Sequence, residues 1–237
     1  MKYLLVILIL MVTLTVFADD LKSFLEFQTH IKNESHRVAD MELHKQIKQS
    51  RESREYEIGD THTYWRYDLS VMPPGWVQLP ATCRAVGEHC YVFVADSEWQ
   101  VNMDEADVQE VFNYLEFETM NGDNYGAVEM DTLHFGEIPD ELDNDPKLIV
   151  FYSALGSFGG STFDGYFSGY DQVTETEAQQ MNPPGHSNEC EMIYMTCHPL
   201  DPTDPIRISV LAHELAHLIH WGGEINEDTW VDEGLAE

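Results

Sequence analysis

The chain has 237 residues, of which 43% are hydrophobic, as is typical of a globular protein and not of a disordered one. Twelve basic residues stand against 43 acidic ones, giving a formal net charge of −31 at pH 7. Such a surface repels phosphate backbones and anionic lipid, so we expect no nucleic-acid partner and no membrane contact beyond the N-terminal segment. The length suits one domain with accessory segments, and the acidity is typical of a well-solvated secreted protein.

The first 18 residues have the layout of a secretory signal peptide. A lysine at position 2 is followed by an almost unbroken apolar run over residues 3–17, which is short for a membrane span. Val16 and Ala18 occupy the −3 and −1 positions of a small-residue cleavage site. We expect cleavage near Ala18-Asp19 and a mature protein that is secreted or held in the cell envelope or periplasm. The alternative is an uncleaved N-terminal anchor.

Residues 19–55 form a charged segment whose first apolar residues share one helical face. This pattern fits a helical pro-segment that docks on the neighbouring domain, and it fits a solvated helical extension equally well. From residue 56 onward the composition changes to short aromatic and β-branched runs, so we place the start of the main domain there.

The four cysteines fall into two local pairs. Six residues separate Cys83 from Cys90, and six separate Cys190 from Cys197. In an exported protein the simplest of the three connectivities is one disulfide within each pair. A zinc site made of these cysteines is less favoured, because neither pair has the two-to-four-residue gap of a zinc knuckle.

The main domain alternates between strand and helix patterns. Strands are predicted at residues 64–71, 75–82, 90–96, 147–152 and 191–195, from runs such as CYVFVAD and KLIVFY. An amphipathic helix is predicted after Asp104, because apolar residues recur at i, i+3, i+4 and i+7 from Val108. The mixture indicates an α+β fold.

Two further segments carry weaker signals. Residues 140–146, DELDNDP, contain four acids and an asparagine that can ligate Ca²⁺, but the spacing is not that of an EF-hand and a solvated turn is favoured. Residues 156–170 alternate glycine with aromatics and lack a phosphate-binding frame. We expect a loop there that leads into an edge strand bordering a substrate cleft.

The strongest pattern lies in a helix that begins at Asp204-Pro205 and ends at Gly222-Gly223. His213 and His217 are four residues apart, so their imidazoles project from the same face and can share one ion. Glu214 lies beside them, where it can reach a metal-bound water. This H-E-x-x-H arrangement suits Zn²⁺, because neutral imidazoles preserve its Lewis acidity and a carboxylate can accept the proton of the water.

Each of these residues has a structural alternative. The histidines can belong to a buried helix that satisfies them by hydrogen bonds, but burying several imidazoles and a carboxylate is costly unless something ligates them. His220 lacks the glycine and third histidine that a metzincin requires, so we expect it to be a packing or cleft-lining residue.

Acidic residues downstream can complete a metal site. Fifteen residues separate His217 from Glu233, enough for a tight loop and a helical turn back over the histidines. Glu233 is therefore the expected third zinc ligand, with Asp232 as the runner-up. Glu237, one turn further, can orient a ligating histidine through a hydrogen bond. The alternative for Glu233 and Glu237 is an exposed acidic helix face.

HELAH followed by WVDEGLAE resembles the gluzincins, zinc metallopeptidases whose third ligand is a glutamate on the following helix. The form HLIHW and NEDTWVDEGLAE, with AVGEHCYVFV and KLIVFY upstream, is most similar to the hyicolysin-like secreted bacterial metallopeptidases over residues 56–237. The resemblance implies a zincin-like N-terminal lobe with a mixed β-sheet packed on the active-site helix. It implies zinc on His213, His217 and Glu233, with Glu214 as the base.

Two departures from the family follow from the same residues. The spacing from His217 to Glu233 is shorter than in thermolysin-like and aminopeptidase gluzincins, which indicates a different branch. The sequence ends at Glu237, before the C-terminal lobe that normally completes the cleft, so we expect it to be part of a longer protein.

The sequence therefore predicts a secreted zinc endopeptidase that acts on proteins or peptides. Two alternatives remain: a secreted adhesion or structural protein with a non-catalytic zincin-like domain, and a zinc hydrolase with a non-peptide substrate.

Overall fold

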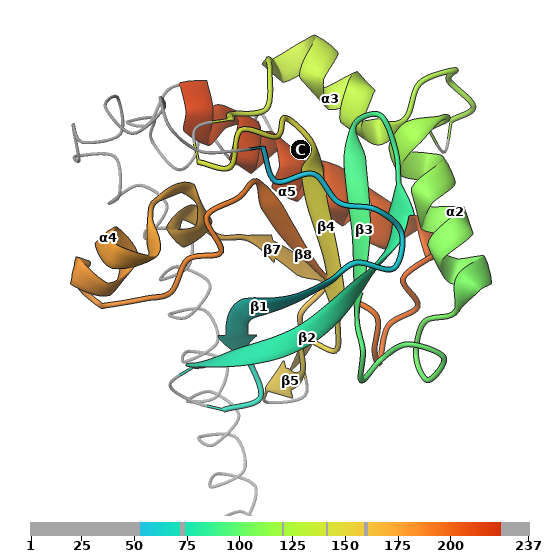
Figure 1. The fold of residues 1–237 in the computed structure, drawn as a ribbon. Coiled ribbons are helices and arrows are strands. Elements are labelled where there is room, and N and C mark those ends of the chain that lie inside the picture. Colours follow the sequence, from blue (N-terminus) through green and yellow to red (C-terminus); the bar gives the residue numbers. More distant parts are fainter. Residues whose placement is uncertain (1–52, 72–73, 120, 141, 159–160, 224–237) are drawn as a thin grey trace, which may run out of the picture.

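Eight β-strands, four α-helices and one 3-10 turn make up the described part of the computed structural model (Figure 1), which covers residues 53–71, 74–119, 121–140, 142–158 and 161–223. The strands are β1 (Thr61–Asp68), β2 (Gly75–Val86), β3 (Cys90–Ala95), β4 (Leu148–Ser153), β5 (Ser157–Phe158), β6 (Ser161–Thr162), β7 (Gly165–Phe167) and β8 (Met192–Thr196). The α-helices are α2 (Glu105–Glu116), α3 (Ala127–Phe135), α4 (Glu175–Gln180) and α5 (Pro205–Gly223), and a 3-10 turn covers Gly169–Gln172.

Six strands form the main sheet in the order β1-β2-β3-β4-β8-β7, while β5 and β6 form a separate hairpin. The central strands β3, β4 and β8 run parallel, and every residue of all three is buried. β2 pairs antiparallel with β3, and the edge strand β7 pairs antiparallel with β8. The continuous apolar runs of the sequence are therefore the strands that are covered on both faces.

Three helices cover one face of the sheet (Figure 1). α2, α3 and α5 pack there on alternate residues of the central strands, such as Val92, Val150 and Ile193. We call this layer the helix-side core. α2 begins at Asp104, whose side chain accepts hydrogen bonds from the backbone N–H groups of Ala106 and Asp107, as its N-cap position predicts.

The other face of the sheet is covered by strands and a loop segment rather than by long helices. The curled strands β1 and β2 and the segment between β7 and β8, which contains α4, cover it (Figure 1). This strand-side core is rich in aromatics, including Tyr64, Phe93, Phe151 and Tyr194, all of them buried. Tyr166 stacks on Tyr194 with the ring centroids 4.4 Å apart, which ties the edge strand to β8.

The α+β class and the mixed sheet are confirmed, and the predicted strands and the helix after Asp104 are present. α3 and α4 were not predicted. The predicted signal peptide, residues 1–18, and nearly all of the segment 19–55 lie outside the described residues. Among the helices that the structure describes, none is both long and apolar enough to cross a membrane.

The predicted disulfides are absent, since Cys83, Cys90, Cys190 and Cys197 are free and buried. Cys83 lies in the strand-side core and Cys90 in the helix-side core, so the sheet separates their thiols. Cys190 and Cys197 are divided in the same way by the extended strand β8. The prediction of two local bridges is therefore wrong for this structure.

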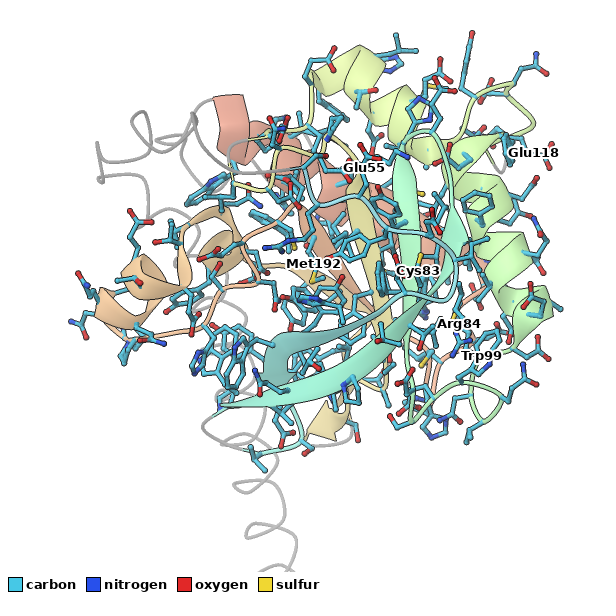
Figure 2. All side chains as sticks on the ribbon, in the orientation of Figure 1. Glu55, Cys83, Arg84, Trp99, Glu118 and Met192 are labelled. Atoms are coloured by element: carbon cyan, nitrogen blue, oxygen red, sulfur yellow. The ribbon has the colours of Figure 1, made fainter. Side chains whose placement is uncertain are left out.

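A β-bulge explains the first of these separations. The pairing of β2 with β3 shifts register between Cys83 and Ala85, so residues that would share a face instead point to opposite cores. Arg84, next to Cys83, extends over the ring of Trp99 with its guanidinium carbon 4.0 Å from the ring centroid (Figure 2). Burial raises the pKa of the Cys83 thiol to about 12, which makes it a poor nucleophile.

Candidate functional site

The candidate site is built on α5, the longest described helix. Pro205 is its first residue, and the Asp204 side chain accepts a hydrogen bond of 2.8 Å from the backbone N–H of Ile206. One face of α5 is anchored in the helix-side core; its buried residues include Ile208, Leu211, Leu215 and Leu218. The predicted start of this helix is confirmed, and the helix continues through Gly222 and Gly223 to the last residue of the described range.

His213 and His217 converge on the half-buried side of α5. Their Nε2 atoms are 3.0 Å apart, and their rings stand nearly perpendicular at 88°. Two imidazole nitrogens bound to one tetrahedral zinc ion at about 2.0–2.1 Å would be separated by roughly 3.3 Å. The observed spacing is close to this value, so the pair fits a shared zinc ion.

The side chain of Glu214 is held by a hydrogen bond from a residue outside α5. Its Oε2 accepts a hydrogen bond of 2.9 Å from the backbone N–H of Phe167, in the edge strand β7. The N–H of an edge residue that points away from the partner strand would otherwise face solvent. The contact fixes the carboxylate beside the histidine pair and places β7 along this side of α5. The segment 156–170 therefore does lead into an edge strand next to the site, as predicted.

His220 takes no part in the histidine pair. Its ring contacts Phe135 at the end of α3 edge-on, with the centroids 5.3 Å apart. This agrees with the prediction of a packing residue. The ring of Trp221 packs beside that of Phe167, with the centroids 6.2 Å apart, so the last turn of α5 that is described also contacts the edge strand.

The predicted third ligand Glu233, its runner-up Asp232 and the orienting residue Glu237 lie outside the described residues, which end at residue 223. The structure thus brings together His213, Glu214 and His217 of the predicted set and leaves the others as predictions.

A second cluster of ligand-type side chains was missed. Asp140 and Asp143, in the loop after α3, meet Glu191, which precedes β8, and oxygen atoms of the three carboxylates lie within 4.8 Å of one another. Asp143 and Asp145 are buried, so the prediction of a solvated turn over residues 140–146 is wrong. The acids of DELDNDP were the available signal, but nothing in the sequence pairs them with a residue 48 positions away.

The carboxyl groups of this cluster have altered proton affinities. Burial raises the pKa of Asp143 to about 6, and burial together with the charge of Asp143 raises that of Glu191. The cluster is thus a place where negative charge is costly.

The sequence matches no protein-family model and no curated protein. What the site can do follows from its donor set: two imidazoles 3.0 Å apart suit a Lewis-acidic metal, and an adjacent carboxylate suits proton transfer.

Proposed function

We propose that this protein is a secreted zinc-dependent endopeptidase of the gluzincin type. The observation that carries the proposal is the 3.0 Å separation of the His213 and His217 Nε2 atoms on a helix whose other face is buried in the helix-side core. Glu233, expected on the following helix, completes the ligand set in this proposal. The secretion proposed here rests on the signal-like residues 1–18.

The histidines have a binding and orienting role. His213 and His217 would present their Nε2 lone pairs to the ion, since zinc binds imidazole in its neutral form. When bound, zinc polarises the scissile carbonyl and lowers the pKa of its water. The buried face of α5 holds the two rings in place, because Leu215 and Leu218 cannot move without leaving the helix-side core.

Glu214 has the proton-transfer role. Its carboxylate accepts the proton of the attacking water and later delivers it to the leaving amine. The hydrogen bond from Phe167 N–H restricts its rotation, so the group does not need to be ordered during the reaction. A carboxylate suits this role because it can hold a single proton between the two events.

A peptide is the substrate class that the surroundings favour. β7 is the edge strand of the sheet, and it runs beside α5 at the level of Glu214. Extended peptides bind edge strands through backbone hydrogen bonds, independently of their side chains. Because the Phe167 N–H already donates to Glu214, a polypeptide would pair with the other outward backbone groups of β7 and so reach the proposed metal position, which favours proteolysis over hydrolysis of a non-peptide substrate.

The test is the activity of Glu214→Gln in the complete protein, assayed on casein or gelatin. Removal of the base should lower hydrolysis by at least about 100-fold and leave zinc content unchanged, because glutamine keeps the shape and loses only the proton acceptor. Glu110→Gln, at an exposed position on α2, is the control with the same charge change and should match the wild type.

Full proteolysis by zinc-loaded Glu214→Gln would contradict the proposed mechanism. Wild-type protein that binds zinc and hydrolyses no peptide would favour the non-catalytic alternative instead.

A further inference from the structure

Three carboxylates meet at the ends of two elements that are distant in sequence. Asp140 and Asp143 come from the loop between α3 and β4, and Glu191 stands directly before the first residue of β8, Met192. Glu191 is fully buried and Asp143 is 4% exposed. Surface acids that gather by chance remain solvated, whereas these have been removed from water.

Glu191 is the member that points to a ligand. Among the described residues, no donor makes a well-formed hydrogen bond to either of its carboxylate oxygens, which face the carboxyl groups of Asp140 and Asp143. Two other buried carboxylates differ from it: Glu116 accepts three backbone N–H groups, and Asp171 accepts from Asn188 and Tyr194. A buried carboxylate without donors is strongly disfavoured unless it takes up a proton or a cation coordinates it.

The charge of the three carboxylates is not balanced by the basic side chain described near them. Arg54 lies near Asp143, since its backbone N–H donates to the Asp143 carbonyl, but its Nη1 donates to the carbonyl of Asn188. Among the described residues, Arg54 is the basic side chain whose charge acts on Asp143, and three ionised carboxylates would exceed that single positive charge. A bound divalent cation would balance that excess.

We propose that Asp140, Asp143 and Glu191 form a calcium site that ties the loop after α3 to the start of β8. An all-oxygen donor set selects a hard cation, whereas zinc favours nitrogen and sulfur. Mg²⁺ usually retains several waters and takes one or two carboxylates, so three carboxylates around a buried position suit Ca²⁺ better. The site is separate from the histidine pair on α5 and does not depend on the proposed enzymatic function.

The site would stabilise the sheet around the active-site helix. The Glu191 carbonyl accepts the backbone N–H of Ile149 in β4, and β8 pairs on its other side with β7, whose Phe167 holds Glu214. Calcium would thus fix the point where β4 and β8 begin.

The test is calcium binding to the full chain after chelation of all metals, by titration calorimetry and thermal unfolding. We expect one Ca²⁺ per chain with a Kd below about 1 mM, and a rise in Tm of about 5–10 °C at saturation. Mg²⁺ at the same concentration should give a smaller shift.

Glu191→Gln keeps the shape and removes one charge. In the absence of metal this variant should be at least as stable as the wild type, and its Tm should no longer rise with Ca²⁺. Asp143→Asn is the second variant, with the same expected loss of the calcium response. Glu137→Gln, an exposed acid of the same loop, is the control and should respond like the wild type.

Absence of calcium binding to the wild type would overturn the proposal, as would an unchanged calcium response in Glu191→Gln and Asp143→Asn. In either case the cluster would be a set of carboxyl groups that share protons.

Discussion

At the scale of single residues, the sequence predicts which side chains can bind a metal ion, but it does not predict which distant residues contact them. The spacing of His213 and His217 suffices to place both on one face of a helix, because helical periodicity acts over four residues. The hydrogen bond from Phe167 to Glu214 joins residues 47 positions apart and depends on where the edge strand lies beside α5. Glu191 belongs to an apolar run that reads as a strand, so its meeting with Asp140 and Asp143 is equally hidden.

Asp171 provides a test of burial at the residue scale. Burial raises its pKa to about 7, although hydrogen bonds from Tyr194 and Asn188 lower it, and Glu175 contributes negative charge nearby. A group whose pKa is higher in the folded state stabilises the fold below its unfolded value of 3.8 and loses that contribution as the pH rises through about 7. The free energy of unfolding should therefore decrease over this range.

Asp171→Asn should flatten that dependence, because asparagine does not titrate. The group can account for at most about 1.4 kcal/mol per pH unit, and buried Asp131, with its pKa also raised to about 7, acts in the same direction. Urea unfolding at several pH values between about 4 and 7 measures the slope, with Glu110→Gln as control. A slope identical to that of the wild type would show that Asp171 does not carry a proton in the folded protein.

At the scale of elements, the pattern succeeds where apolar residues and burial agree. α5 and α2 have capping side chains and continuous apolar faces, so the residues at which they begin could be predicted. α3 could not, because its N-cap is Gly126 without a side-chain cap, Leu133 is 65% exposed and Asp131 is buried. In α3, the positions of the apolar residues therefore do not predict which face of the helix packs against α5.

Leu215→Ala tests the packing that holds the site. Leu215 is completely buried in the helix-side core, so its truncation should lower the free energy of unfolding by about 2–5 kcal/mol. Leu133→Ala removes the same atoms from an exposed position of α3 and should change it by less than about 0.5 kcal/mol. Equal effects in urea unfolding would contradict the assignment of the buried face of α5.

At the scale of the whole molecule, the sheet and the layers packed on its two faces determine which residues meet, and the spacing of residues along the chain does not predict this. Seven positions of extended chain cover about 23 Å, so β8 itself keeps Cys190 and Cys197 apart. The first cysteine pair is separated by a bulge of one residue, which reverses the face of Cys83 and which no sequence signal marks. The same sheet brings α5, β7 and β8 together, and this juxtaposition gives the H-E-x-x-H pattern its surroundings.

The central claim, that α5 presents a zinc site, is tested most directly by zinc content. The complete protein is loaded with zinc, dialysed in excess Ca²⁺ to keep the acidic cluster out of the count, and analysed by mass spectrometry. We predict one zinc per chain in the wild type and in His220→Ala, whose ring contacts Phe135, and loss of zinc in His213→Ala and His217→Ala. A wild type without zinc, or stoichiometric zinc in both His213→Ala and His217→Ala, would contradict the claim.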